Sequence, residues 1–201
     1  MKRLPGACGL VLSLLVLSAR AQVIQFESNG LKYQTLTKSG VTVMFAPLDS
    51  RIREYTILQV AVSNGSPGPY TIRPEDFRYV RSTGDTVQAA AARTVIGMLI
   101  QKGNRSDVIK LVTTYETAFY GMTRMRSTNG YEQRRQAALA ETSTKLKAAA
   151  TASALALVTT KLDPGDSTDG AIFIPTEGKP LGPGHLEVRT NTDTFVFQAM
   201  P

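Results

Sequence analysis

The chain has 201 residues, with 23 lysines and arginines against 16 aspartates and glutamates, and one cysteine, Cys8. This length suits one substantial domain, or a domain with a large insertion, and a single cysteine excludes a disulfide within the chain. The basic residues are scattered, so the net charge of +7 permits contact with anionic surfaces but gives no nucleic-acid signature.

The first 21 residues have the features of a secretory signal peptide. Two basic residues precede an apolar run at residues 10–17, and Ala19-Arg20-Ala21 provides small residues where a signal peptidase cleaves. Cys8 lies before the apolar run, so it is not placed as the acylated cysteine of a lipoprotein. We therefore expect export, a mature periplasmic or extracellular protein that begins at Gln22, and a net charge lowered from +7 to +4 by the loss of three basic residues.

Short β-branched and aromatic runs between turn residues predict strands in the first part of the mature chain. The predicted strands span residues 23–26, 31–36, 41–45, 54–62, 70–72 and 77–80. In the fourth of them, the face that carries Leu58, Val60 and Val62 is the better candidate for burial. The two prolines within residues 64–69 predict a loop, because proline cannot donate to a strand ladder.

A helical insertion is predicted between residues 85 and 160. Residues 85–88, 104–107 and 129–132 each place an N-cap residue three positions before a carboxylate or amide, a pattern typical of helix starts. Three starts predict three helices. The third, about residues 131–159, is rich in alanine and carries Glu141 and Lys145 as an i,i+4 pair. It is either a strut that packs on the other helices or the sheet, or a surface that contacts a partner helix or a lipid surface.

After the helices, Asp-Pro-Gly at residues 163–165 predicts a turn, and the last strands are expected at residues 171–174, 185–189 and 194–198. About nine strands are within the range of an immunoglobulin-like sandwich. The predicted fold class is therefore α+β: an immunoglobulin-like antiparallel β-sandwich with a three-helix insertion between two β blocks, forming a single domain over residues 22–201.

Three stretches resemble secreted bacterial immunoglobulin-like domains of largely unknown function. They are residues 60–65, where a strand ends in Asn64 before a loop, residues 72–77, and residues 162–175, where a Pro-Gly-Asp-Ser turn precedes the strand after Gly170. The helical block departs from the simple pattern of that family. The resemblance implies a fold and an exported compartment, and it supplies no catalytic residue.

Candidate chemistry is sparse. Asp163, Asp166 and Asp169 are spaced three apart, so either a calcium loop or local turn hydrogen bonds would explain them. His185 is the only histidine, and no Gly-x-Ser-x-Gly elbow, P-loop or dinucleotide fingerprint is present. We expect no cofactor, no catalytic or metal-ligating set and no enzymatic activity. A carboxylate pair that meets only in the fold leaves a small envelope hydrolase as the alternative.

The expected function is that of an exported, non-catalytic binding or structural module of the bacterial cell envelope. Its partner is expected to be a protein or another envelope component, contacted through the helical insertion or the adjacent loops. A membrane surface is the less favoured partner, and nucleic acid is not expected. Arg134, Arg135 and Lys145 on the third predicted helix are the candidate contact residues. The oligomeric state is left open by the sequence.

Overall fold

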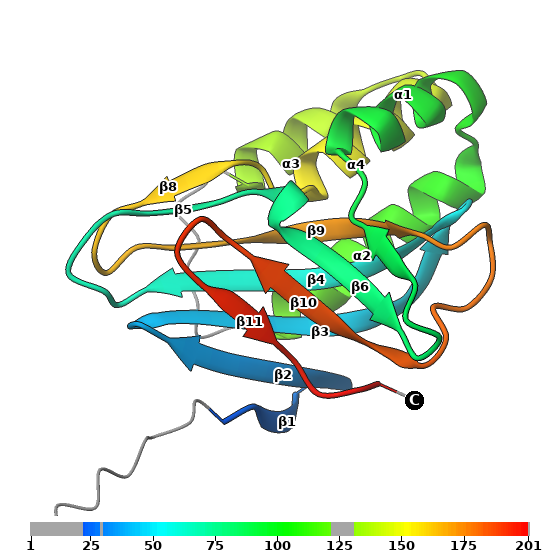
Figure 1. Ribbon diagram of the computed structural model, residues 1–201. Coiled ribbons are helices and arrows are strands. Elements are labelled where there is room, and N and C mark those ends of the chain that lie inside the picture. The colour runs from blue at the N-terminus through cyan, green and yellow to red at the C-terminus, as the bar shows by residue number, and fades with distance from the viewer. Residues whose placement is uncertain (1–21, 29, 122–130, 201) are drawn as a thin grey trace, which may run out of the picture.

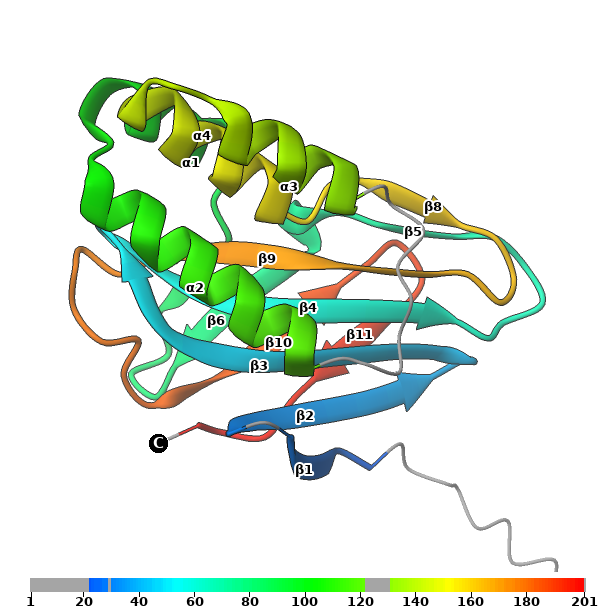
Figure 2. The ribbon, with the colours of Figure 1, turned by 180° about the vertical axis from the view of Figure 1, so that it is seen from behind.

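The computed structural model describes residues 22–28, 30–121 and 131–200, and Figures 1 and 2 show it from opposite sides. Within these residues the chain forms eleven strands, four α-helices and one short 3-10 helix, so the fold class is α+β. The predicted signal peptide and its cleavage site lie outside the described residues.

The larger sheet has five strands in the order β1-β2-β3-β4-β9, and every neighbouring pair is antiparallel. Residues 55–63 of β4 pair with residues 167–175 of β9, so the two β blocks share this sheet. The bounds are β1 (Ile24–Ser28), β2 (Leu31–Lys38), β3 (Val41–Ile52), β4 (Tyr55–Asn64) and β9 (Ser167–Pro175).

The second sheet has four antiparallel strands in the order β11-β10-β6-β7, and a short pair, β5-β8, lies beside the sheets. Because β6 pairs with β10, this sheet too joins the two β blocks. Its bounds are β6 (Phe77–Arg81), β7 (Thr86–Gln88), β10 (Gly184–Arg189) and β11 (Thr194–Val196); the others are β5 (Tyr70–Ile72), the 3-10 helix (Pro74–Asp76) and β8 (Thr160–Leu162). Every predicted strand is confirmed in position, whereas β7 and β8 were not predicted.

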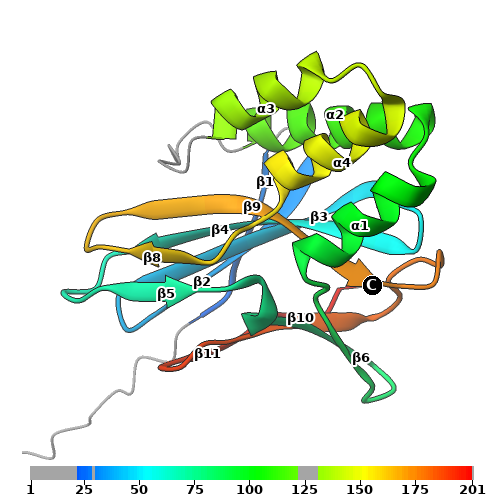
Figure 3. The same ribbon diagram turned by 90° about the horizontal axis from the view of Figure 1, so that it is seen from above.

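The two sheets pack face to face, as the view from above shows (Figure 3). Large apolar side chains fill the space between them. The rings of Phe45 and Phe197 meet edge to face, with their centroids 4.8 Å apart. The fully buried large residues of this inter-sheet core include Phe45, Leu58, Ile72, Phe77, Tyr79 and Phe195. Removing such side chains from water supplies about 1.5–3 kcal/mol each, so this core is a major source of stability.

Four helices cover the opposite face of the five-stranded sheet. They are α1 (Ala92–Lys102), α2 (Arg105–Gly121), α3 (Tyr131–Ala140) and α4 (Thr144–Leu155). Helix α4 contacts the other three, and its buried residues are mostly alanines. β4 is buried on both faces: the predicted burial of Leu58, Val60 and Val62 is confirmed, and the opposite face is buried as well. None of the helices within the described residues combines the length and apolar character that crossing a bilayer requires.

The predicted first helix does not begin at Asp85. Residues 81–88 form a hairpin instead, in which Thr86, Val87 and Gln88 pair with β6 and the hydroxyl of Thr83 donates to the Asp85 carboxylate at 2.9 Å. The helix begins only at Ala92. The apparent helix cap at Asp85 is therefore a turn residue, because an aspartate can accept the same short-range bonds in a tight turn. The cap of the second helix is confirmed: Asn104 Oδ1 accepts from the Asp107 amide at 3.0 Å.

The predicted third helix is two helices, so the described insertion holds four rather than three. Helix α3 ends at Ala140, and α4 begins after Ser143, whose backbone is extended and whose carbonyl accepts from the Lys147 amide at 2.7 Å. The run Thr142-Ser143-Thr144 favours a cap over a helix interior. The break lets α3 lie against α4, and it places Glu141 outside the helix of Lys145, so their predicted i,i+4 pair does not exist.

Asn64 is the corner at which the β blocks join. Its side chain donates to the carbonyls of Gly68 at 2.8 Å and Leu162 at 3.0 Å, while its backbone amide donates to Asp166 and its carbonyl accepts from Gly165. Asn64 is fully buried, so each of these bonds satisfies a group that water cannot reach. The Asn and Pro-Gly-Asp motifs behind the family resemblance thus hold one structural corner.

Candidate ligand pocket

The predicted contact residues lie in the helical layer. Lys145 is exposed in the first turn of α4. Arg134 and Arg135 belong to α3, which packs on α4, but their side chains lie outside the described part of the structure. A shared surface for the three residues therefore stays a prediction.

The three aspartates of the possible calcium loop lie on different local structures. The Asp166 carboxylate accepts from the Asp163 amide at 3.1 Å within the turn, whereas Asp169 lies in β9 opposite Ala61. In the part of the chain that the structure describes, no group of three or more His, Cys, Asp or Glu side chains is placed to hold a metal ion. His185 is half-buried in β10 opposite Val80.

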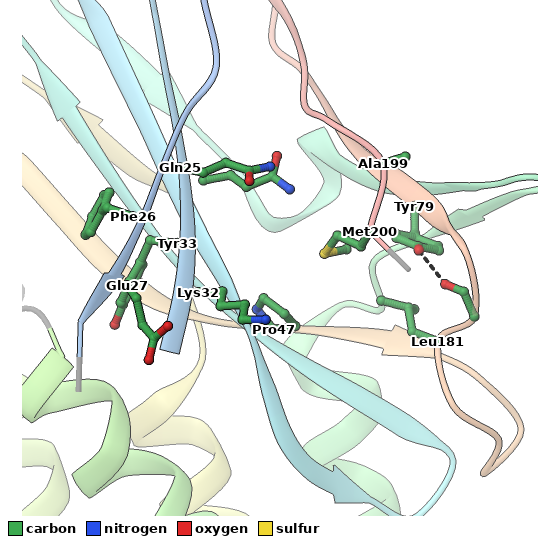
Figure 4. A pocket seen from close by; sticks show the side chains of 12 residues that line it. Gln25, Phe26, Glu27, Lys32, Tyr33, Pro47, Tyr79, Leu181, Ala199 and Met200 are labelled. Carbon is green, nitrogen blue, oxygen red and sulfur yellow. Dashed lines mark hydrogen bonds between the residues drawn. The ribbon is translucent and has the colours of Figure 1, made fainter. Parts of the chain in front are cut away.

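A pocket with a partly apolar lining lies elsewhere, at the open margin between the two sheets (Figure 4). Its volume is about 590 Å³, which is within the range of small-molecule sites. Strands β1 and β2 form one wall, and the C-terminal segment with the loop before β10 forms another. The lining residues are Gln25, Phe26, Glu27, Lys32, Tyr33, Gln34, Pro47, Tyr79, Leu181, Gly182, Ala199 and Met200.

The register of β1 on β2 sets the first wall. Gln25 lies opposite Gln34 and Phe26 lies opposite Tyr33. Because side chains alternate across a strand, Gln25 turns toward the inter-sheet space while Phe26 turns toward the helical face. The rings of Phe26 and Tyr33 stack there, with centroids 5.2 Å apart and an interplanar angle of 14°. Figure 4 accordingly shows this stack on the far side of the strand pair from Met200 and Leu181.

Amide side chains hold the C-terminal segment against this wall. Gln34 donates to the Gln198 carbonyl at 3.2 Å and accepts from the Gln198 amide at 2.9 Å, so one side chain reproduces a pair of strand hydrogen bonds. Gln25 donates to the Gln198 side chain at 2.7 Å. On its other side, the segment pairs with β10 through the Met200 amide and the Gly184 carbonyl, 2.6 Å apart. The pocket is thereby enclosed without a continuous sheet.

The back wall depends on Tyr79 and Gly184. The Tyr79 hydroxyl donates to the Gly182 carbonyl at 2.6 Å and fixes the loop that carries Leu181. A Cβ at position 184 would lie 2.8 Å from the Tyr79 ring, closer than real side chains come. Only glycine therefore allows β10 to approach this ring.

The pocket carries its charge at the rim. Burial raises the pKa of Tyr33 to about 12 and also raises that of Tyr79, where nearby Arg81 offsets part of the effect. Both phenols are neutral near pH 7, and Tyr33 donates to Gln59 Oε1 at 3.3 Å. The charged lining residues are Glu27 and Lys32, which are opposite in register and exposed.

This arrangement suits binding more than proton transfer. The lining contains no serine, cysteine, histidine or aspartate, and its phenols donate to acceptors within the protein. Pro47, Leu181 and Met200 offer an apolar interior. No sequence motif signalled the pocket, since its walls come from four separate segments. The only trace in the sequence is a glutamine in or beside each of three predicted strands, Gln25, Gln34 and Gln198.

Comparisons with known proteins do not assign the chain to a family. No family model and no curated protein matches it. Among solved structures, the yjhA protein from Bacillus subtilis is similar over 86% of this chain and 93% of that chain, with 8% sequence identity and a TM-score of 0.35. A likeness of that size supports no statement about fold or function.

Proposed function

We propose that this protein is an exported, non-catalytic binding module of the bacterial cell envelope, built on an immunoglobulin-like sandwich with an inserted helical layer. Two antiparallel sheets packed face to face support the sandwich assignment. The corner at Asn64 adds support, because it uses the residues that carry the family resemblance. Export rests on the Ala19-Arg20-Ala21 site of the sequence.

The observation that carries the binding proposal is the pocket between the sheets. Its interior is apolar, and its rim carries the cation of Lys32 beside the carboxylate of Glu27. A ligand with an apolar body and an anionic group matches this lining, because the body leaves water while the charge stays at the exposed mouth. The helical layer, with Lys145, remains the second proposed contact surface.

A fluorescence titration with 1-anilinonaphthalene-8-sulfonate tests the pocket, because this probe is apolar and anionic. We expect saturable binding to one class of site in the chain from Gln22. Met200→Glu places a carboxylate in the apolar interior and should weaken binding at least about tenfold. Lys32→Gln should weaken it less, since a rim charge acts through solvent. Only variants whose melting temperature equals that of the wild type are compared.

Leu146→Glu is the matched control, because Leu146 is 47% exposed on α4, far from the pocket lining. Equal losses of binding in Met200→Glu and Leu146→Glu would show that the probe binds exposed apolar surface in general. Turnover of p-nitrophenyl acetate that disappears in Glu27→Gln, the carboxylate of the lining, would instead favour the hydrolase alternative.

A further inference from the structure

The edges of the two sheets differ in how they are protected. Along β9, the Ala90 amide donates to Phe173 at 2.8 Å and the Leu157 amide donates to Ala171 at 2.9 Å, so residues outside the strands cover that edge. At β11, the Lys38 ammonium donates to the Thr194 carbonyl at 2.6 Å. β1, by contrast, has only β2 as a partner among the described strands, and it lies at the margin of the sheet in Figures 1 and 2.

β1 is short and carries one charged residue, Glu27, but it lacks the other usual devices that prevent edge pairing. Its sequence, Ile-Gln-Phe-Glu-Ser, has no proline and no lysine, and its pairing with β2 runs without a register shift. Ile24 is 61% exposed and Phe26 is 42% exposed, both on the helical face of the sheet. With no described strand against its outer edge and two exposed apolar side chains, β1 is a surface suited to an added strand.

We propose that β1 pairs antiparallel with β1 of a second copy of this chain, about a twofold axis at Gln25. In this register Gln25 faces Gln25 of the second copy, and each Ile24 faces a Phe26. Directly opposite side chains of an antiparallel pair have Cβ atoms about 5 Å apart, so both apolar residues would be covered on each side of the axis. The two five-stranded sheets would become one continuous sheet.

The sequence of the strand favours a second copy as the occupant because the strand is complementary to itself. Glu27 would face Val23 of the second copy rather than another carboxylate, so no like charges meet. A twofold axis at Phe26 would instead place Ile24 opposite Ser28 and leave it without an apolar partner. A twofold axis normal to the sheet does not exchange the two faces of the sheet. The helical layers of both copies therefore lie on the same side of the joined sheet.

The proposed β1–β1 contact also adjoins the pocket, since Gln25, Phe26 and Glu27 belong to the pocket lining. In the proposed register, Val23 of the second copy stands across from Glu27 at the rim. The paired segment is short, about seven residues or 24 Å, and it belongs with small interfaces that bury less than about 1,200 Å². We therefore expect an equilibrium that depends on concentration rather than a permanent dimer.

Sedimentation velocity of the chain that begins at Gln22, the expected mature form, is the first test. The dimer fraction should rise between about 10 and 500 µM. Ile24→Lys should keep the protein monomeric, since it puts a cation opposite Phe26. Val196→Lys is the matched control: Val196 is 50% exposed on the edge strand of the other sheet. A monomer at all concentrations, or equal effects of the two variants, overturns the proposal.

Cysteine cross-linking is the second test, and it reports the register in which the two β1 strands pair. The single cysteine, Cys8, precedes Gln22, so the chain that begins at Gln22 contains no cysteine. A single introduced cysteine therefore reports only the contact at its own position. Gln25→Cys should form a disulfide dimer rapidly, because the two thiols would face each other across the axis. Glu27→Cys is the control on the same strand, with its two copies about 14 Å apart in this register. Equal cross-linking rates for the two variants would mean random collision and would overturn the pairing.

Discussion

The two faces of the five-stranded sheet are packed in different ways. The inter-sheet face is filled by large side chains such as Phe45, Phe77 and Phe195. The opposite face is covered by helices, among which α4 packs on the other three through small residues that include Ala148 and Ala152, both with no exposed surface. The contrast shows that the inter-sheet core and the helical layer reach close packing by different means, with large side chains between the sheets and close approach of the helices around α4.

This contrast leads to different responses to substitution. A large residue that becomes small leaves a cavity, whereas a small residue that becomes large must displace its neighbours. Gly103 illustrates the tightness of the helical side: a Cβ there would lie 3.2 Å from the Cβ of Ala148. Substitutions in the inter-sheet core, in the helical layer and on the exposed surface should therefore differ in their effects.

The largest effect is expected from removing residues after Thr160. Truncation there deletes β9, β10 and β11, so β4 and β6 lose partners and both faces of the sheet are opened together. We expect the remaining chain to lose its cooperative thermal transition, measured by circular dichroism. A fragment that melts as sharply as the whole chain would show that the first β block and the helices fold independently.

On the inter-sheet face, Phe195→Ala should lower the free energy of unfolding by about 3–5 kcal/mol. Phe195 is fully buried between the sheets, so the truncated side chain leaves a cavity. Urea denaturation measures the change. The control is Val196→Ala, the next residue, which is half exposed and should change stability by less than about 0.5 kcal/mol. Similar losses for the two would mean that β11 is not part of the core.

On the helical face, enlargement should be the damaging change. Ala152→Leu places three extra carbon atoms where α4 has no exposed surface, and should lower the free energy of unfolding by about 1–3 kcal/mol. Ser153→Leu, one residue further on the exposed side of α4, is the matched control and should be tolerated. Denaturant titrations compare the two. If Ala152→Leu is neutral, the helical layer is loosely packed and the contrast between the faces fails.

The same contrast explains what the sequence could and could not predict. Strands were placed correctly because short β-branched runs and the turn at Ser39 and Gly40, which have φ angles of 50° and 82°, are local signals. The pattern along β4 correctly identified Leu58, Val60 and Val62 as a core face, but it did not report that helices bury the opposite face as well. Burial of that kind depends on helices that begin 28 residues after the end of β4, which periodicity within one strand does not report.

Helix boundaries failed where one local pattern fits two structures. Asp85 and Gln88 have the spacing of a helix cap, yet pairing of Val87 with Tyr79 selects a hairpin. The break at Ser143 has a capping residue, but the alanines on both sides favour an unbroken helix when read alone. The pocket could not be predicted at all, because Gln34 meets Gln198 only after the strands have taken their register.

The outer face of the four-stranded sheet extends the comparison to a polar surface. Burial alone would raise the pKa of Glu187, but hydrogen bonds from Arg78 at 2.7 Å and Arg189 at 2.6 Å outweigh it and hold the pKa below the ordinary value of 4.5. A carboxyl whose pKa is lowered by folding stabilises the protein fully above its unfolded pKa, and this contribution is lost as the pH falls through the folded pKa.

We therefore expect the melting temperature to fall as the pH is lowered below about 4.5, and the slope to be shallower in Glu187→Gln. Glu177→Gln is the control, because Glu177 is exposed. Differential scanning calorimetry across this range measures both slopes. A slope that is unchanged in Glu187→Gln would assign the acid sensitivity to other carboxyls.

The smallest effect on stability is expected at the predicted contact residues of the helical layer. Lys145 is exposed on α4, so replacing it together with Arg134 and Arg135 by glutamate should change the free energy of unfolding by no more than about 0.5 kcal/mol. Reversal of three charges should still disturb an electrostatic contact, because long-range attraction depends on the sign of the surface charge. Pull-down of envelope components with wild type and triple variant, at two salt concentrations, measures the contact. The matched control is Lys161→Glu, an exposed lysine on β8 outside the helices.

The prediction fails if wild type, triple variant and control recover the same components with the same salt dependence. In that case the helical layer serves only to cover the sheet, and partner binding must depend on the pocket margin at β1.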